Sequence, residues 1–132
     1  MFPPNTRVLV VDDMATMRKI VSKTCKDVGF SDIQEAADGT KAWEIINSSA
    51  VPIQLVISDW NMPNSTGLDL LKRVRSDSRF KQLPFLLVTA ESEKQQVIDA
   101  MSAGVDGYIL KPFNPTQLKD KLEAVHGKYA KK

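Results

Sequence analysis

Short runs of apolar residues alternate along the chain with stretches of helical periodicity. The clearest runs cover residues 7–11, 55–57 and 85–89, and apart from Arg7 and Phe85 they consist of β-branched residues and leucine. Such runs are typical of strands that are buried on both faces of a parallel sheet. Weaker runs at 33–36 and 107–110 complete the set, so the pattern predicts five strands.

Apolar residues spaced three and four positions apart follow each run. Between the first two runs this spacing predicts an amphipathic helix over 17–28, which Gly29 ends. A last helix is expected to begin at Asn114 and Pro115, a capping residue followed by a proline in the first turn. In chain order, the predicted helices after the first are 42–48, 68–74, 97–104 and 114–125.

A strand followed by a helix, repeated five times, predicts an α/β fold with a doubly wound five-stranded parallel sheet and five helices. The length of 132 residues is that of one domain, so we expect residues 1–132 to form a single unit with its core at about 6–127. Sheets of this kind bind ligands beyond the carboxyl ends of their strands, so the loops at those ends are the place to search for chemistry.

Polar and charged residues stand at four of the five strand ends. Asp12 and Asp13 follow the first predicted strand, Asp59 follows the third, Thr89 ends the fourth, and Lys111 follows the fifth. If these four strands are neighbours, three carboxylates, a hydroxyl and an ammonium group converge on one crevice. Taken singly, each residue has an ordinary role as a helix cap, a turn residue or a solvated charge.

Three clustered carboxylates repel one another and resist joint ionisation unless a cation is present. Oxygen ligands without nitrogen or sulfur suit Mg²⁺, which often takes phosphate oxygens as further ligands. A carboxylate also serves as a nucleophile toward phosphorus, and Lys111 can balance a second anion. The arrangement therefore predicts a phosphoryl acceptor assisted by Mg²⁺, acting through positioning and charge neutralisation.

Composition excludes several other classes of protein. Eighteen basic and sixteen acidic residues give a net charge of +2, which argues against a protein that coats nucleic acid. Cys25 and His126 are the sole residues of their types, too few for an internal disulfide or a four-ligand zinc site. Neither a signal peptide nor a transmembrane run is present in the sequence, so a cytoplasmic protein is expected.

Beyond these patterns, several short motifs resemble the receiver domain of two-component response regulators, and most of all its chemotaxis members. The resemblance covers about residues 6–127 and implies the flavodoxin-like strand order 2-1-3-4-5. The motifs are Asp12–Asp13, the run SDWNMP at 58–63, VTAE at 88–91, Ala103–Gly104, Gly107–Tyr108 and KPF at 111–113.

The resemblance implies a role for each residue of the acidic crevice. Asp59 is the residue that becomes phosphorylated, and the side chains of Asp13 and Asp59 bind Mg²⁺. Asn61 adds its backbone carbonyl to the metal, whereas Asp12 acts mainly through bound water. Lys111 pairs first with Asp59 and then with a phosphoryl oxygen.

By the same resemblance, the hydroxyl of Thr89 moves to hydrogen-bond the phosphoryl group, which leaves room for Tyr108 to rotate inward. One loop departs from the family pattern. Receivers commonly carry an apolar residue and then Asp or Asn before the glycine of this loop, whereas this chain has Ser65 and Thr66 before Gly67. The family pattern therefore does not predict the conformation of this loop.

The resemblance also implies partners. A CheA-like histidine kinase is expected to phosphorylate the protein, and a FliM-like flagellar switch protein to bind its active form. A CheZ-type or other phosphatase is a further possible partner. We expect a monomer without an output domain and without a nucleic acid or membrane partner. We also expect no enzymatic activity beyond the protein's own phosphotransfer and dephosphorylation. The expected partner-binding residues are Ser92, Lys94, Tyr108 and Lys121.

Other functions remain open from sequence. A phosphorelay shuttle or a phosphate sink would use the same site without acting on the motor. Phosphatases of the haloacid dehalogenase type also use an aspartate nucleophile and Mg²⁺, but they require a second aspartate two residues later, where this chain has Asn61. A flavodoxin is disfavoured, because the loop after the first strand is acidic where a flavin phosphate needs hydroxyls and amides.

Overall fold

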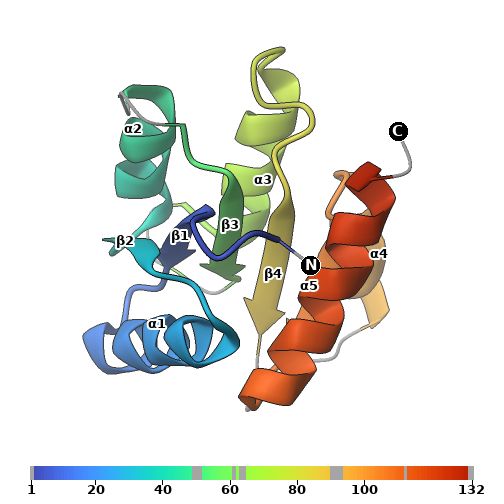
Figure 1. Cartoon of the computed structure of the whole chain (residues 1–132). Helices are drawn as coiled ribbons and strands as arrows, with labels where there is room; N and C mark the ends of the chain where they lie inside the picture. Colours follow the sequence, from blue (N-terminus) through green and yellow to red (C-terminus); the bar gives the residue numbers. More distant parts are fainter. Residues whose placement is uncertain are drawn as a thin grey trace.

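The computed structural model describes residues 2–48, 52–60, 62, 65–89, 94–111 and 113–130. Five strands and five helices alternate along these segments, which confirms the predicted α/β class (Figure 1). In chain order the elements are β1 (Arg7–Val11), α1 (Ala15–Val28), β2 (Asp32–Ala36), α2 (Gly39–Ser48), β3 (Leu55–Asp59), α3 (Gly67–Ser76), β4 (Phe85–Thr89), α4 (Lys94–Ser102), β5 (Gly107–Leu110) and α5 (Pro115–Ala130).

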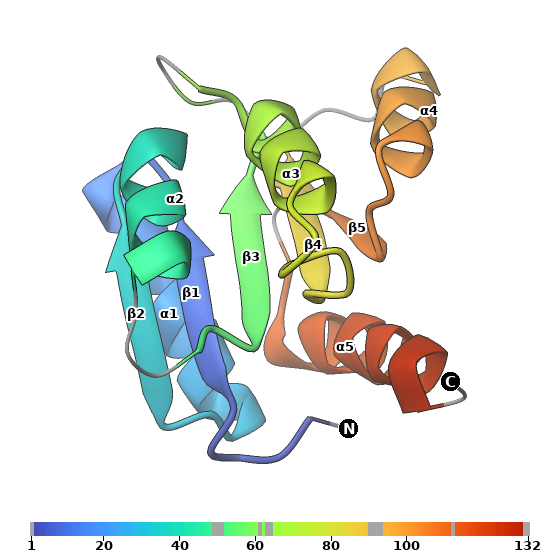
Figure 2. The same ribbon diagram turned by 90° about the horizontal axis from the view of Figure 1, so that it is seen from above.

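All neighbouring strands are parallel, in the order β2-β1-β3-β4-β5 that was predicted. Helices cover both faces of the sheet, with α1 and α5 on one face and α2, α3 and α4 on the other (Figures 1 and 2). Because the strands are parallel, their carboxyl ends meet at one edge, as the arrowheads in Figure 2 show. Because β1, β3, β4 and β5 are neighbours in this sheet, the polar residues at their carboxyl ends can converge as predicted.

Alternate strand residues supply the two cores. Val8 and Val10 of β1 belong to the cluster packed under α1 and α5, whereas Leu9 and Val11 belong to the cluster under α2 and α3. Successive side chains of a strand point to opposite faces, and here each face is covered by helices. This explains why the strands carry uninterrupted apolar runs rather than alternating polar residues.

The loop before α3, which departs from the family pattern, closes through ordinary capping chemistry. The Thr66 hydroxyl accepts a hydrogen bond from the Asp69 backbone N–H at 3.1 Å, and the Asp69 carboxylate accepts one from the Thr66 N–H at 3.1 Å. Thr66 therefore serves as the N-cap of α3, a role for which Thr, Asp and Asn are all suited. Ser65 lies directly against Gly39, where a Cβ would stand 2.6 Å from its Oγ.

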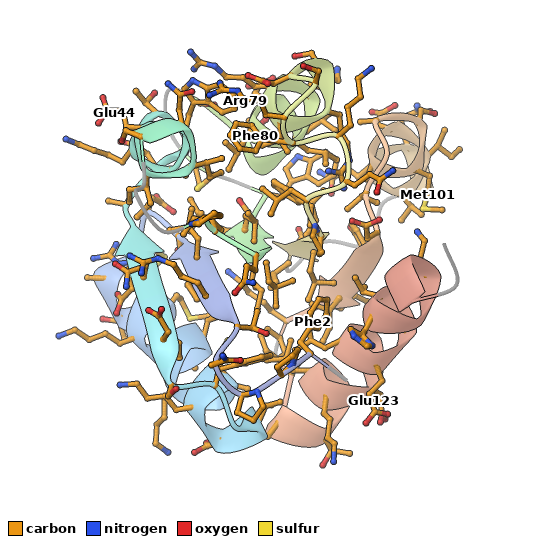
Figure 3. The ribbon with its side chains drawn as sticks, turned by 45° about the horizontal axis from the view of Figure 1, so that its top comes forward. Phe2, Glu44, Arg79, Phe80, Met101 and Glu123 are labelled. Carbon is orange, nitrogen blue, oxygen red and sulfur yellow. The ribbon has the colours of Figure 1, made fainter. Side chains whose placement is uncertain are left out.

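Both chain ends pack further than the predicted core. Helix α5 continues past Val125 to Ala130, and Phe2 is buried at the other end of the chain. The Phe2 ring lies edge-on to His126 of α5, with 5.0 Å between the ring centroids, and Figure 3 shows Phe2 beside that helix. None of the helices in the described segments is long and apolar enough to cross a bilayer.

A polar cluster at the amino end of the sheet was not predicted from sequence. Arg75 of α3 donates to the carbonyls of Gly104, Phe80 and Leu83 at 3.0, 3.2 and 2.7 Å. Its Nη2 also pairs with Asp106 Oδ2 at 2.8 Å, and the same oxygen accepts the N–H of Phe85, the first residue of β4, at 2.9 Å. One guanidinium thereby joins α3, the loop before β4 and the turn before β5.

Candidate functional site

Three carboxylates meet at the carboxyl edge of the sheet. Asp12 and Asp13 follow β1, and Asp59 is the last residue of β3, the strand next to β1. One oxygen from each lies within 4.8 Å of the others. Asp12 and Asp59 are buried, at 2% and 9% exposed, whereas Asp13 faces solvent. The cluster therefore has two buried members and one on its open side.

Lys111 provides the counter-charge for both buried carboxylates. Its Nζ lies 3.1 Å from Asp59 Oδ1 and 3.2 Å from Asp12 Oδ2, and its side chain is 14% exposed. The Lys111 backbone N–H donates to the carbonyl of Thr89 at 2.8 Å, which ties the loop after β5 to the end of β4. One ammonium group shared by two carboxylates leaves the cluster with a net negative charge.

Burial raises the pKa of the Asp59 carboxyl above its ordinary value. The attraction and hydrogen bond of Lys111 lower the pKa but offset only part of this effect, and the negative charge of Asp12 raises it again. A buried carboxylate beside a second one is costly to ionise, and a cation in the pocket removes that cost. The electrostatics of the cluster therefore favour binding of a cation.

The main chain around Asp59 leaves no space for a side chain at Gly67. The Trp60 N–H donates to the Val88 carbonyl at 3.0 Å, and the Gly67 N–H donates to the Trp60 carbonyl at 2.9 Å. A Cβ on Gly67 would collide with the carbonyl oxygen of Asp59. Glycine is required here because the first residue of α3 packs against the backbone of the aspartate itself.

Asp12 is held from several sides. Its Oδ1 accepts the Met14 N–H at 2.9 Å, and its own N–H donates to the Ala36 carbonyl of β2 at 3.1 Å. The carbonyl of Asp12 accepts a hydrogen bond from Arg18 Nη1 at 2.9 Å. Arg18 has no signal in the sequence, because a charged residue in the first turns of an amphipathic helix is expected on the solvent side.

Two further predicted residues lie along β4 and β5. Thr89 is fully buried at the end of β4. Tyr108 of β5 is partly buried, packs against the core under α3, and also lines a cavity of about 490 Å³. Lys121 of α5 lines the same cavity, so the structure brings Tyr108 and Lys121 together on one face. Asn61, Ser92 and the Lys94 side chain lie outside the described residues.

The donor set fits a hard divalent cation. Its potential ligands are carboxylate oxygens, from Asp12, Asp13 and Asp59, and the exposed Asp13 leaves one side open to water. Mg²⁺ prefers this chemistry, since it binds proteins through one or two carboxylates and keeps several waters. An acidic pocket of this kind at the edge of a 2-1-3-4-5 parallel sheet defines a class of protein, the receiver domains.

The comparison with known families agrees. Residues 8–123 match the response regulator receiver domain, and the chain belongs to this family. It is 50% identical over 121 residues to the chemotaxis protein CheY1 of Helicobacter pylori, covering 92% of this chain and 97% of that protein. It is 46% identical over 119 residues to CheY of Pseudomonas aeruginosa, covering 90% and 94%.

Solved structures give the same result. The CheY4 protein of Vibrio cholerae superimposes with a TM-score of 0.81 at 35% identity, over 92% of this chain and 98% of that one. The resemblance to CheY that the motifs at the strand ends indicated is therefore confirmed across nearly the whole chain.

Proposed function

We propose that this protein accepts a phosphoryl group on Asp59 from a histidine kinase, with Mg²⁺ bound, and carries a chemotaxis signal to a flagellar switch protein. The observation that supports this most directly is the environment of Asp59. This carboxylate ends β3 beside two other carboxylates and lies 3.1 Å from Lys111. The CheY relatives, named as chemotaxis proteins, support the assignment of the pathway.

The proposed transfer needs no base from this chain. A carboxylate oxygen of Asp59 forms a bond to phosphorus while the bond from phosphorus to the donor's imidazole nitrogen breaks, and the histidine leaves with the bonding pair. Mg²⁺, held by Asp13 and Asp59, supplies charge neutralisation for the phosphoryl oxygens when bound. Lys111, already 3.1 Å from Asp59, pairs with another phosphoryl oxygen. We expect no turnover of any other substrate.

The buried position of Thr89 and the intermediate position of Tyr108 suit a two-state switch. Thr89 ends the strand adjacent to β3, where its hydroxyl can approach a phosphoryl group on Asp59. Tyr108 lies one strand further on and contacts both the core and the cavity. A charge change at Asp59 would then alter the surface at Tyr108 by shifting the populations of two conformations.

The surface around α4, β5 and α5 is the proposed binding face for the switch protein. Its cavity is lined by apolar Val97, Ile109 and Leu110 together with Lys121. Ile98, Met101 and Leu110 are 47%, 62% and 45% exposed, and Figure 3 shows Met101 at the outer side of α4. Asp120 and Lys121 both line this mostly apolar hollow, so it suits a short helical or extended segment with an acidic residue placed to pair with Lys121. We propose that the protein receives and delivers this signal in the cytoplasm.

A peptide from the N-terminus of a FliM protein is expected to bind more tightly after phosphorylation with acetyl phosphate and Mg²⁺. Lys121→Glu is expected to weaken that binding about tenfold, because it places a negative charge beside an acidic ligand. Fluorescence anisotropy of a labelled peptide measures both effects. Lys119→Glu is the matched control, since Lys119 is exposed on the same helix and does not line the cavity.

Each outcome of this measurement has a separate meaning. Binding that does not depend on phosphorylation contradicts the proposed switch. Phosphorylation with no binding to the peptide indicates a phosphate sink, and phosphate-dependent capture of a histidine phosphotransfer protein in its place indicates a phosphorelay shuttle.

Binding of Mg²⁺ is expected to quench the fluorescence of Trp60, the residue that follows Asp59. Asp13→Ala is expected to abolish the change by removing the exposed carboxylate of the cluster. The titration is followed as tryptophan emission against Mg²⁺ concentration in the full chain. The other tryptophan, Trp43 of α2, packs against Arg73 of α3 and against Phe80 in the loop after α3. The variant Trp43→Phe removes its contribution and so identifies the part of the emission that comes from Trp60. An unchanged titration in Asp13→Ala would count against the assigned metal ligands.

A further inference from the structure

Arg18 connects three elements at the back of the acidic cluster. It belongs to the first turns of α1, its Nη1 donates to the carbonyl of Asp12 at 2.9 Å, and its Nε donates to Glu35 Oε1 of β2 at 3.0 Å. The Arg18 side chain is 19% exposed, against 39% for Glu35. The guanidinium is therefore held close to the protein between an ion-pair partner and the main chain of a predicted metal-site residue.

The Asp12 carbonyl lies just past the end of strand pairing. The register of β1 with β2 ends at Val11 and Ala36, and the Asp12 N–H makes the last bond to β2. The Asp12 carbonyl is the first group without a partner from β2, and Arg18 supplies the donor. This bond restrains the plane of the peptide that joins Asp12 to Asp13, and that plane carries the Cα atom from which the Asp13 side chain extends.

Arginine suits this position because its planar fork presents several donors at fixed angles. Two of its nitrogens reach two acceptors at once, Glu35 on β2 and the main chain of Asp12 just after β1, whereas the single ammonium group of lysine is a point charge on a flexible chain. Glu35 fixes the orientation of the fork and offsets its charge. Glu35 of β2 thus holds Arg18, and Arg18 in turn holds the turn that contains Asp12 and Asp13, two of the three carboxylates.

We propose that Arg18, oriented by Glu35, is a positioning residue that sets the Asp12–Asp13 turn for Mg²⁺ binding. This role rests on the Mg²⁺ binding of the proposed function. Within the described segments, the Arg18 side chain bonds to Glu35 and to the carbonyl of Asp12, so it acts on the metal site through the main chain of Asp12.

The sign of the effect separates positioning from simple charge. Arg18 is a cation near a cation site, so by Coulomb attraction and repulsion alone its removal would strengthen Mg²⁺ binding. A positioning role predicts the reverse, because a turn free to adopt other orientations loses part of the preorganised ligand geometry. Groups that orient metal ligands change affinity by about 10–100-fold when they are lost.

The experiment titrates Mg²⁺ into the full-length protein and three variants, followed by tryptophan fluorescence. Arg18→Met, which keeps the apolar stem, is expected to raise the dissociation constant for Mg²⁺ about tenfold. Arg18→Lys is expected to raise it by less, since the ammonium reaches one acceptor at a time. Lys19→Met is the matched control because it removes the same charge from an exposed neighbour on α1, and it is expected to leave the constant unchanged or slightly lower.

A second readout tests whether the effect is confined to the metal. Added Mg²⁺ stabilises any state that binds it, so the rise of the unfolding temperature with Mg²⁺ is expected to shrink in Arg18→Met. At saturating Mg²⁺ the rate of phosphorylation by acetyl phosphate is expected to return to that of the unaltered protein. If Arg18→Met fails to fold, Arg18→Lys, which keeps the charge, carries the test.

The possible failures are distinguishable. If the unaltered protein binds no Mg²⁺, the metal site of the proposed function is wrong. If it binds Mg²⁺ and Arg18→Met binds as well or better, with Arg18→Lys unchanged, then the positioning role of Arg18 is overturned while the proposed function stands.

Discussion

Asp59→Asn is expected to abolish the phosphoryl adduct that acetyl phosphate and Mg²⁺ form on the protein, and at the same time to stabilise the fold. The first effect follows because an amide oxygen neither carries the charge nor has the nucleophilicity of a carboxylate. Asp12 and Asp13 belong to the same cluster, but both follow β1, whereas Asp59 ends the central strand β3. We therefore expect neither of them to accept the phosphoryl group in place of Asp59. Intact-mass spectrometry before and after incubation measures the adduct.

The second effect follows from the raised pKa of Asp59. Since burial raises this pKa, the folded state binds the proton more tightly than the unfolded chain. The stability that protonated Asp59 contributes is fully present below the pKa of the unfolded chain. It is lost as the pH rises through the higher pKa of the folded protein. At neutral pH the ionised carboxylate is therefore a cost to the fold, and asparagine removes it.

Lys111 is not left without a partner in this variant, because Asp12 Oδ2 remains 3.2 Å from its Nζ. Urea unfolding in Mg²⁺-free buffer at neutral pH is expected to show a higher midpoint for Asp59→Asn. The gain should shrink as the pH falls through the titration of Asp59, and it should also shrink when Mg²⁺ is added. Asp27→Asn, an exposed carboxylate on α1, serves as the control and should change neither property. An adduct that survives Asp59→Asn would disprove the assignment of the phosphoacceptor.

Arg75→Met is expected to destabilise the protein by about 3 kcal/mol or more, the usual effect of removing one partner of a buried ion pair. The loss removes donors from three carbonyls and leaves Asp106, 9% exposed in its side chain, with less compensation. Lys128, 3.5 Å from Asp106 Oδ1, remains to offset part of that charge. Unpaired buried polar groups add their own cost of desolvation.

Urea unfolding monitored by circular dichroism measures the change. Lys72→Met alters an exposed cation on the same helix and is expected to stay within about 0.5 kcal/mol of the unaltered protein. Arg75→Lys keeps the charge but not the fork, so it is expected to lie between the two. A loss below about 1 kcal/mol for Arg75→Met would show that the cluster is not a buried network of the kind described.

The sequence predicted the fold and the cluster at the strand ends because both depend on local patterns. Apolar runs and helical spacing marked each element, and the rule for parallel sheets placed Asp12, Asp59 and Lys111 together. The roles given to these residues stay predictions. The capping by Thr66 was not predicted, because the departure from the family pattern, rather than the capping preference of threonine, distinguishes that loop in the sequence.

Arg18 and Arg75 were not found from sequence for a physical reason. Both lie on amphipathic helices where arginine is common on the solvent face, and their partners are distant in the chain or on the main chain. Arg75 pairs with Asp106, 31 residues away, and with carbonyls that have no side-chain signature. No periodicity or motif distinguishes such an arginine from an exposed one, so only the three-dimensional structure identifies it.

The packing around Asp59 differs between its two sides, because Gly67 lies directly against the Asp59 carbonyl on the side of α3. Helix α3 packs so closely against the end of β3 that no Cβ fits at Gly67, and its first turn is capped by Thr66 and Asp69. Helix α4 is different, because Ala100 is the one fully buried residue among its described side chains. A disturbance at Asp59 therefore has a direction. We expect it to be resisted on the side of α3 and to move α4 and β5 instead, so structures of different states would be best superimposed on β1, β3 and α3.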